Sequence, residues 1–406
     1  MIRVESEIGK LRRVIVHRPG LEIARITPAN KEALLFDDLL WLDRAQDEHD
    51  EFVDILRSFD TEVLYFSDLL KTVLAMPEAR REVVDAAISP ATCGRLVAEQ
   101  LRVKLYEADA SRVFDVLVGG LLERELIQWG IAPVFADLVA DRFHYVLRPL
   151  PNLLFMRDNS AWINQGLVLS VLAYPARQRE SAYMRAIYRH HPLFAEAGYP
   201  LWFGLDENDR YPATLEGGDV LVLNKETVML GLSERTAPAA VENLAERLFA
   251  ESDVRQAIVV HLHQRRAMMH LDTAFTMVDH DAFNVFPGLL EDVDVHLLRP
   301  GREAAIDVVR ASSLQAALAE ALGHDDIRFI PTGGDAIGRL REQWDDGNNT
   351  VAVAPGVVVA YARNQETNRR LREYDIEVLE LDASELCRGR GGSRCMTQPL
   401  LRDPVG

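Results

Sequence analysis

The sequence predicts a mixed α/β fold interrupted by a helical insert, and three observations lead to that prediction. Short strand-like segments occur before residue 69 and again after residue 149, with helical segments between them. Residues 70–146 instead carry apolar side chains three and four positions apart, without strand-like alternation. The third observation is Gly-Gly-Asp at residues 217–219 and again at 333–335, which suggests repeated strand-turn-strand modules, as in propeller-like folds.

The elements of the N-terminal part follow from local patterns. Residues 11–16 read Leu-Arg-Arg-Val-Ile-Val and predict a strand, which the turn residues His17-Arg18-Pro19-Gly20 end. Residues 47–59 carry apolar side chains at helical spacing, and residues 62–65 predict a second strand. A helix between two strands is typical of an α/β fold.

Residues 70–148 are expected to form an inserted all-helical bundle of four or five helices. Pro77, Pro90 and the Gly-Ile-Ala-Pro at residues 130–133 separate its helices. The insert contains no obvious chemistry, so packing or partner contact is its expected role. Residues 1–69 and 149–406 together then form the catalytic α/β domain.

Strands dominate again after residue 149. Strand pairs are expected within residues 161–171 and 221–230, and residues 273–278 and 351–362 continue the strand pattern. Four helices are expected between them, at residues 181–190, 239–249, 312–322 and 367–374.

Composition narrows the classes of function. The chain has 406 residues, 48% hydrophobic and 27% charged, as in globular proteins, and its formal net charge is −18. That charge argues against nucleic acid and anionic membranes as partners, and it suits a cationic substrate. The N-terminus lacks the apolar core of a signal peptide, and the longest apolar run, residues 351–362, is too short to span a membrane. Three cysteines without a Cys-x-x-Cys pair give no disulfide framework, so a reducing cytoplasm is expected.

The segment with the strongest chemical signal is residues 388–397, Arg-Gly-Arg-Gly-Gly-Ser-Arg-Cys-Met-Thr. Glycines let the backbone approach a ligand closely, and neighbouring cations favour the thiolate form of a cysteine. Cys395 is therefore the candidate nucleophile, and a surface loop with an incidental thiol is the alternative. Cys387 and Cys93 are expected to be packed rather than reactive.

Polar groups elsewhere complete a possible site. Asp158 follows Arg157, and Glu216 precedes a Gly-Gly pair. His270 and Asp272 are two residues apart, which places them on one side of an extended segment. Two carboxylates can clamp a guanidinium, arginines such as Arg177 and Arg235 can bind a carboxylate, and a Cys–His pair suits covalent catalysis. Together they suit an amino acid with a guanidino side chain, attacked at its central carbon.

Each of these residues also has a structural interpretation. Asp158 can be half of a surface ion pair, Glu216 can belong to a turn, and His270 can be a half-buried histidine. A metal cluster is a further alternative for the histidines and acids of one region, but their spacing matches no standard signature, and we expect no metal. These residues are His261, His263, His270, Asp272, Asp279, His280 and Asp281.

Motifs along nearly the whole chain resemble the bacterial arginine deiminase family of the guanidino-group-modifying superfamily. They include Leu35-Phe36-Asp37-Asp38, Arg157-Asp158, Pro175-Ala176-Arg177, Glu216-Gly217-Gly218-Asp219, His270-Leu271-Asp272-Thr273, Ala354-Pro355-Gly356-Val357-Val358, Arg363-Asn364 and the Cys395 loop. The chain departs from the family pattern at Met156 and Tyr174, where Thr and Trp are common, and neither is a proposed catalytic residue.

The resemblance implies a five-bladed α/β propeller of ββαβ-type modules with pseudo-fivefold symmetry, plus the helical insertion. It implies hydrolysis of free L-arginine to L-citrulline and ammonia without cofactor, as the first step of arginine catabolism, by a homo-oligomer (dimer or tetramer). The roles that it implies are nucleophile for Cys395, general acid/base for His270, orientation of His270 for Glu216, guanidinium binding for Asp158 and Asp272, and α-carboxylate binding for Arg177, Arg235 and Asn152, with Arg390 near the entrance.

Other functions are also compatible with these residues. Agmatine deiminase and dimethylargininase share the chemistry, although the two arginines proposed as a carboxylate clamp argue against agmatine, which has no carboxylate. An amidinotransferase would pass the amidino group to an amine instead of water. A non-catalytic arginine-binding protein that acts through the insert is the alternative from another class.

Overall fold

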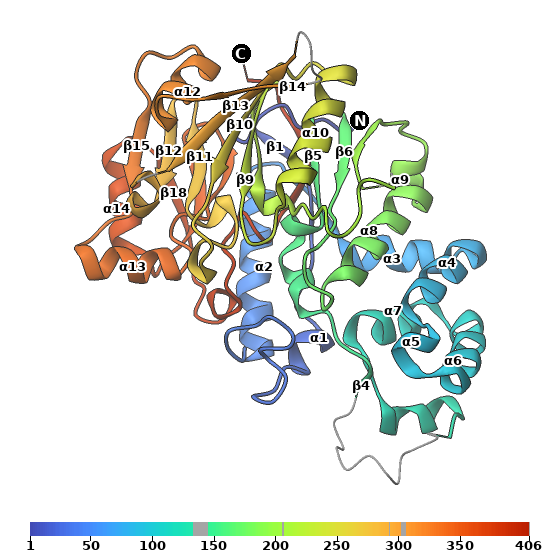
Figure 1. The fold of residues 1–406 in the computed structure, drawn as a ribbon. Helices are drawn as coiled ribbons and strands as arrows, with labels where there is room; N and C mark the ends of the chain where they lie inside the picture. The colour runs from blue at the N-terminus through green and yellow to red at the C-terminus, as the bar shows by residue number, and fades with distance from the viewer. Residues whose placement is uncertain (133–144, 205–206, 292, 302–305, 406) are drawn as a thin grey trace.

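The computed structural model describes residues 1–132, 145–204, 207–291, 293–301 and 306–405. Strands occupy the upper part of the molecule in the view of Figure 1, with helices around them, and helices α4–α7 project to one side below. Both chain ends lie at the strand-rich end (Figure 1). Within the described residues, no helix is long and apolar enough to cross a membrane.

One strand pattern occurs five times in the described chain: an antiparallel pair whose second strand also pairs in parallel with a third. In the unit that joins the chain ends, β1 (Leu11–Val16) pairs antiparallel with β19 (Gln398–Arg402) and parallel with β2 (Glu62–Tyr65). The other four units are β5–β6–β7 (Ser160–Ile163, Gly166–Leu169, Leu201–Phe203), β8–β9–β10 (Val220–Asn224, Thr227–Leu232, Gln256–His261), β11–β12–β15 (Phe275–Asp279, Ala282–Val285, Arg328–Pro331) and β16–β17–β18 (Val351–Ala354, Val357–Tyr361, Glu377–Leu381). The strands β13 (Asp294–Pro300) and β14 (Ile306–Arg310) extend the third sheet beyond β10.

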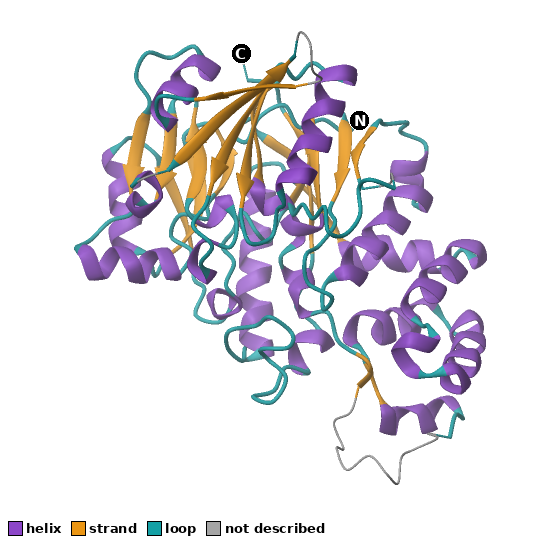
Figure 2. Ribbon diagram, in the orientation of Figure 1, coloured by secondary structure: helices purple, strands orange, loops and turns teal. Residues whose placement is uncertain are grey.

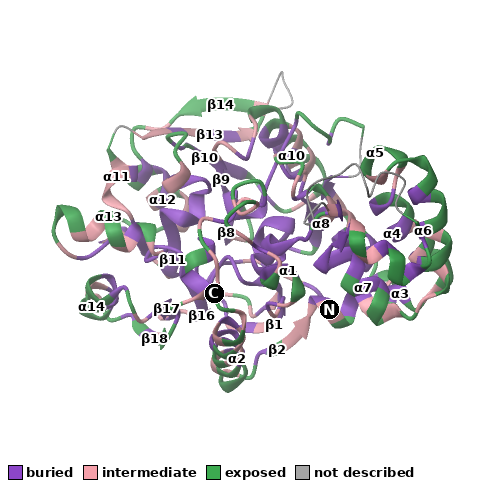
Figure 3. Cartoon of the chain, turned by 90° about the horizontal axis from the view of Figure 1, so that it is seen from below, coloured by how far each residue is buried: buried purple, intermediate pink, exposed green. Residues whose placement is uncertain are grey.

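A helix connects the second and third strands of each unit, because parallel neighbours need a crossover rather than a hairpin. These helices are α2 (Leu42–Ser58), α8 (Gln178–His190), α10 (Pro238–Glu251), α12 (Leu314–Leu322) and α14 (Gln365–Glu373). They confirm the helices expected from apolar spacing, although α2 begins at Leu42 rather than at Asp47. Their inner faces are buried, whereas the outer faces of α2 and α14 are exposed (Figure 3).

The Gly-Gly-Asp repeat does not mark a repeated module, so that part of the prediction was wrong. The first copy forms a short 3₁₀ turn, Gly217–Asp219, that leads into strand β8. The second copy lies between β15 and helix α13 (Ala336–Trp344), where Asp335 caps the helix by accepting a hydrogen bond from the Gly338 N–H at 2.7 Å. Asp is a favoured N-cap residue, and this local role explains the second copy.

The predicted insert is largely helical but not entirely so. It contains α4 (Pro77–Ala87), α5 (Pro90–Cys93), α6 (Arg95–Glu107) and α7 (Ala110–Gly119), after α3 (Phe66–Leu74) at its start. The expectation of an all-helical bundle is corrected by two short strands, β3 (Leu121–Leu122) and β4 (Tyr145–Leu147), which pair antiparallel. Residues 133–144, also assigned to the insert, lie outside the described residues.

The insert shares its hydrophobic core with the neighbouring α/β unit. Val84 and Leu117 from the insert belong to the same cluster of buried side chains as Trp162 of β5 and Tyr183 of α8. Tyr183 also donates a hydrogen bond to the Leu117 carbonyl at 3.3 Å. Because this core is continuous, burial of apolar surface stabilises the insert and that unit together.

Candidate active site

The predicted catalytic residues lie shortly before the first strand of four of the repeated units. Asp158 belongs to the 3₁₀ turn before β5, Glu216 precedes the turn before β8, and His270 and Asp272 lie at the turn before β11. Cys395 lies shortly before β19. The first three turns contact one another. Repetition of one strand pattern therefore brings together residues that are far apart in sequence.

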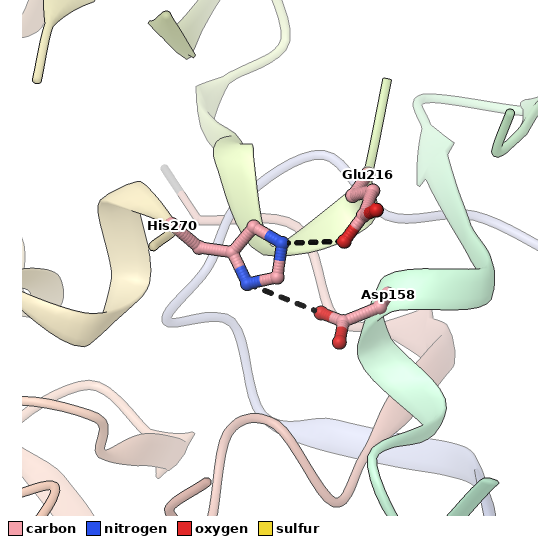
Figure 4. A group of neighbouring side chains, drawn as sticks. All are labelled: Asp158, Glu216 and His270. Carbon is pink, nitrogen blue, oxygen red and sulfur yellow. Dashed lines mark hydrogen bonds and ion pairs between the residues drawn. The ribbon is translucent and has the colours of Figure 1, made fainter. Parts of the chain in front are cut away.

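The imidazole of His270 lies between two carboxylates (Figure 4). Its Nε2 is 2.7 Å from Glu216 Oε2, and its Nδ1 is 3.6 Å from Asp158 Oδ1. Burial lowers the pKa of His270, but Asp158 and the hydrogen bond to Glu216 outweigh burial and raise that pKa to about 9. His270 is therefore an imidazolium near neutral pH. A side chain at Gly218 would lie 2.7 Å from this ring, so the close approach requires glycine.

Glu216 is fully buried and held from three sides. Its Oε1 accepts a hydrogen bond from the Ala173 N–H at 3.0 Å, and its Oε2 contacts His270 and the Arg235 Nη1 at 3.3 Å. Burial raises the pKa of Glu216, but Arg235 and His270 outweigh that effect and lower it to about 2. The carboxylate thus stays ionised and fixes the orientation of the His270 ring.

Asp272 links the Cys395 loop to the centre of the molecule. Its Oδ2 accepts a hydrogen bond from Arg394 Nη1 at 2.7 Å and lies 3.7 Å from Cys395 Sγ. Arg394 also bridges to Glu7, with Nε 3.0 Å from Glu7 Oε2. Because Arg394 is the neighbour of Cys395 in sequence, its ion pairs with Asp272 and Glu7 fix the Cys395 loop against Asp272.

Cys395 is buried, and its thiol has a pKa well above the ordinary value, because burial, Asp272 and Asp158 outweigh Arg394. The three arginines of the loop do not act together, as the sequence had suggested. Arg388 pairs with Asp38 at 2.7 Å on the surface, and Arg390 stacks on the Trp344 ring at 3.6 Å. Of the three, Arg394 is the one whose charge acts among the main influences on this pKa, and it lowers the pKa against burial and the carboxylates.

Comparison with known proteins identifies the family. A family model described as arginine deiminase matches residues 32–402. Over 404 residues the chain is 45% identical to an arginine deiminase of Rhodococcus opacus (strain B4), which covers 98% of this chain and 97% of that protein. The chain belongs to the arginine deiminase family.

Solved structures at low identity share the mixed α/β fold. The amidinotransferase SxtG of Microseira wollei, from a saxitoxin biosynthetic pathway, aligns over 100% of this chain and 98% of its own, at 14% identity and a TM-score of 0.57. A dimethylarginine dimethylaminohydrolase in an adduct with S-methyl-L-thiocitrulline aligns over 96% and 100%, at 13% identity and a TM-score of 0.53. AgrE in complex with ornithine and NAD⁺ gives a TM-score of 0.54 at 15% identity over 97% of this chain, which spans only 40% of AgrE.

Arg177 lies beside Asp158 in the candidate site, and Asn152 lies beside Arg177. The Arg177 guanidinium contacts Asp158 Oδ2 at 2.7 Å and Glu180 Oε2 at 2.9 Å. Its Nη2 donates to the backbone carbonyl of Asn152 at 3.3 Å, while the Asn152 side chain donates to the Leu34 carbonyl at 2.7 Å. Asn152 therefore positions the loop around Leu34 in this structure.

The other two predicted arginines differ in their surroundings. Arg235 is buried beside Glu216 and lies over the Tyr174 ring at 4.5 Å. The Tyr174 that departs from the family pattern is thus a stacking partner. Arg390 is buried with a positive φ of 64°, and none of its guanidinium nitrogens has a hydrogen-bond partner within the described residues. An unpaired guanidinium is available to an anion.

Sequence reasoning missed three polar residues of the site, Glu180, Glu7 and Asn349, and the anchoring contacts of Arg394. Glu180 pairs with Arg177, three residues away, but this pair left no recognisable sequence signal. Arg394 pairs with both Glu7 and Asp272, which are far from it in sequence, and so anchors Asp272. Asn349 contacts Cys395 itself, with Nδ2 at 3.1 Å from Sγ. A polar Gly-Asn-Asn-Thr directly before the apolar β16 was the available signal for Asn349.

The acid–histidine cluster is better described as an ion pair network than as a metal centre. Asp158, Glu216 and His270 offer ligand atoms within 4.8 Å of one another, and they are the only such group among the described residues. The two carboxylates face different nitrogens of one imidazole, so they bind the imidazolium rather than converge on a single ion (Figure 4). The His261–Asp281 region that sequence offered as an alternative does not gather into such a group in the described structure.

Proposed function

We propose that this chain is an arginine deiminase that hydrolyses free L-arginine to L-citrulline and ammonia through a covalent cysteine intermediate. The observation that carries the proposal is the placement of Cys395 Sγ beside Asp272, with the His270 imidazolium held between Glu216 and Asp158. Nucleophile, proton donor and carboxylates for a cationic substrate thus occupy one buried site.

Asp158 and Asp272 are the proposed guanidinium ligands. Each binds an arginine of the protein through Oδ2, at 2.7 Å from Arg177 and at 2.7 Å from Arg394, respectively. In each carboxylate, Oδ1 is buried and accepts no hydrogen bond from the described residues. Asp272 Oδ1, and Asp158 Oδ1 at 3.6 Å from His270 Nδ1, keep acceptor capacity for the paired N–H groups of a guanidinium, because an unmet acceptor is costly when buried.

Arg177 and Arg235, with Asn152, are the proposed ligands of the substrate α-carboxylate, and Arg390 is proposed to bind substrate near the entrance. Arg235 and Arg177 both lie near Glu216, which contacts His270 directly. Planar guanidinium groups bind carboxylates through paired hydrogen bonds. This cationic side of the site favours arginine over agmatine, which has no carboxylate.

The proposed reaction uses the Cys395 thiolate as the nucleophile and the His270 imidazolium as the proton donor. The Cys395 thiolate bonds to the guanidinium carbon, and His270 gives its proton to the departing amino nitrogen. The C–N bond breaks, ammonia leaves, and an S-alkylthiouronium remains on Cys395. Water then adds to the same carbon; one of its protons returns to His270, and the other is released as the ureido C=O forms and is taken up by ammonia as ammonium. The C–S bond breaks, which releases L-citrulline and restores the thiolate, so one water is consumed. General acid/base help of this kind contributes about 10²–10⁴-fold.

The substrate itself is proposed to generate the thiolate. In the free protein, burial and the carboxylates keep the pKa of Cys395 high. A guanidinium between Asp158 and Asp272 offsets their charge and adds a cation beside the sulfur, which lowers that pKa. Rapid alkylation of Cys395 in the free protein well below neutral pH would contradict this step.

The decisive experiment measures citrulline and ammonia formed from L-arginine, with Cys395→Ala as the control. We expect equimolar products that the control does not form. If arginine gives no product, agmatine and methylarginines are the next substrates. Addition of glycine or ornithine tests amidino transfer, which would give a different product. Tight arginine binding without ammonia release would favour a non-catalytic binding protein.

We further propose that the five units close into a five-bladed α/β propeller with pseudo-fivefold symmetry. The recurrence of one antiparallel-then-parallel strand pattern with a crossover helix supports this arrangement. Residues 1–69 and 149–406 would form the propeller domain, and residues 70–148 the insertion. The shared core around Trp162 implies that the insertion does not fold independently.

The remaining proposals concern the setting of the enzyme. Three free cysteines suit a reducing compartment, so we infer a cytoplasmic enzyme. Arginine breakdown by such an enzyme would be the first step of arginine catabolism. A homo-oligomer, dimer or tetramer, is expected from the family resemblance, and size-exclusion chromatography with light scattering tests it.

A further inference from the structure

The strand unit that begins with β16 also contributes a polar residue to the candidate site. In four units, the segment before the first strand carries Asp158, Glu216, His270 with Asp272, or Cys395. In the unit of β16, the equivalent residue is Asn349, two positions before Val351. It is 1% exposed and lies beside the nucleophile.

The side-chain amide of Asn349 contacts Cys395 at two atoms. The Cys395 N–H donates to Asn349 Oδ1 at 2.9 Å, and Asn349 Nδ2 donates to Cys395 Sγ at 3.1 Å. Nδ2 also donates to the backbone carbonyl of Asp272 at 3.0 Å. These partners fix the orientation of the amide, because a flipped amide would face an N–H with its own N–H₂ and a carbonyl with its oxygen.

The backbone around Asn349 is equally constrained. Its N–H donates to the Asp346 carbonyl at 3.0 Å, and its own carbonyl accepts from Ser393 Oγ at 3.4 Å. A Cβ at Gly392 would overlap that carbonyl, so glycine lets the nucleophile loop pack directly on Asn349. A side chain held so firmly acts without reorganisation when charge develops at its partner.

We propose that Asn349 is a further catalytic residue of the proposed deiminase reaction, which holds Cys395 in place and donates a hydrogen bond to its sulfur when that sulfur is negatively charged. Asp272 lies 3.7 Å from the sulfur, its charge and those of Asp158 and Asp346 oppose the thiolate, and the charge of Arg394 favours it. Arg394 is already paired with Asp272 and Glu7. A neutral N–H donor stabilises a thiolate without forming an ion pair with these carboxylates.

Three variants test this inference. Asn349→Ala removes both contacts with Cys395, whereas Asn349→Asp keeps the size and the acceptor but replaces the donor with a carboxylate oxygen. Asn348→Ala is the matched control, because Asn348 is an adjacent buried asparagine that bonds to Asn284 at 2.7 Å and Thr332 at 2.8 Å instead. Each variant is compared with the unmodified chain by circular dichroism and thermal midpoint, so that loss of folding is distinguished.

The first readout is alkylation of Cys395 by iodoacetamide across pH, followed on its peptide by mass spectrometry. At a pH below the titration midpoint, we expect about a tenfold slower reaction in Asn349→Ala, equivalent to one pKa unit, and a larger effect in Asn349→Asp. Asn348→Ala should keep the original profile. The second readout is kcat for arginine, expected to fall about 10²-fold in both Asn349 variants with little change in KM.

The two readouts separate this inference from the proposed function. An unchanged alkylation profile in a folded Asn349→Asp protein overturns the role of Asn349, whatever the substrate. An equal shift in Asn348→Ala also overturns it, because the effect would then be structural. A slower alkylation specific to Asn349 supports it, even if arginine gives no product and the function proposed above fails. If Asn349→Ala does not fold, the isosteric Asn349→Asp decides.

Discussion

Neutralising Glu7 should destabilise the fold strongly at neutral pH and much less in acid. Glu7 is 6% exposed and accepts hydrogen bonds from Arg394 and from the Val222 N–H at 3.2 Å. Burial raises the pKa of Glu7, but Arg394 and Arg157 outweigh burial and lower that pKa from 4.5 to about 2. Glu7→Gln keeps the shape of the side chain and removes the charge that faces these buried arginines.

The size of the effect follows from linkage between proton binding and folding. A pKa lowered by about 2.5 units contributes about 3 kcal/mol to the free energy of unfolding at pH 7, and about 1.5 kcal/mol at pH 3. The folded-state pKa lies below the unfolded value, so this contribution is complete above about pH 4.5 and is lost as pH falls toward 2. The loss caused by Glu7→Gln should therefore shrink in acid.

Urea unfolding of the two proteins at pH 7 and pH 3 measures this difference. The control is Asp253→Asn, which breaks an exposed ion pair with Lys225 and should cost about 0.5 kcal/mol or less at either pH. A loss below 1 kcal/mol at pH 7, or an equal loss at both pH values, would refute the reasoning.

Three further predictions concern the site. His270→Ala should lower citrulline formation by about 10²–10⁴-fold, and His190→Ala, a surface histidine paired with Glu82, should leave the rate within about twofold. The His270 ring should titrate near pH 9 in NMR spectra of the free protein, and Glu216→Gln should lower that midpoint, since it removes a carboxylate bonded to the ring; an unmoved midpoint would contradict the assigned contact. Arg235→Lys should raise KM for arginine about 10- to 100-fold and leave agmatine turnover unchanged, which steady-state kinetics with both substrates will show.

Local patterns predicted most of the elements, because alternation and helical spacing are properties of neighbouring residues. The strand at residues 11–16 is β1, and the segment 161–171 holds the pair β5 and β6 as expected. The two Gly-Gly-Asp tripeptides suggested a repeat that the structure does not have at these positions. The second copy is explained by a local function instead, because Asp335 is the N-cap of helix α13. The true repeat lies in strand pairing, which a tripeptide does not encode.

The site was predicted in its residues but not in its contacts. His270 and Glu216 are 54 residues apart, and Arg394 and Glu7 are 387 apart, so no spacing rule connects them. The family resemblance supplied the roles of the first pair. Arg394 was read only as one of three loop cations, whereas the structure uses it as the anchor of Asp272.

The position of these residues explains why a nucleophile can work among so many carboxylates. Each strand unit delivers its polar group on the segment before its first strand, so acids, histidine and cysteine meet in one buried place. Asp272 and Asp158 raise the pKa of Cys395 and Arg394 lowers it, while Asn349 Nδ2 donates a hydrogen bond to its sulfur. In the proposed reaction, the carboxylates that suppress the free thiolate also bind the guanidinium that activates it, which would couple substrate recognition to the reactivity of the sulfur.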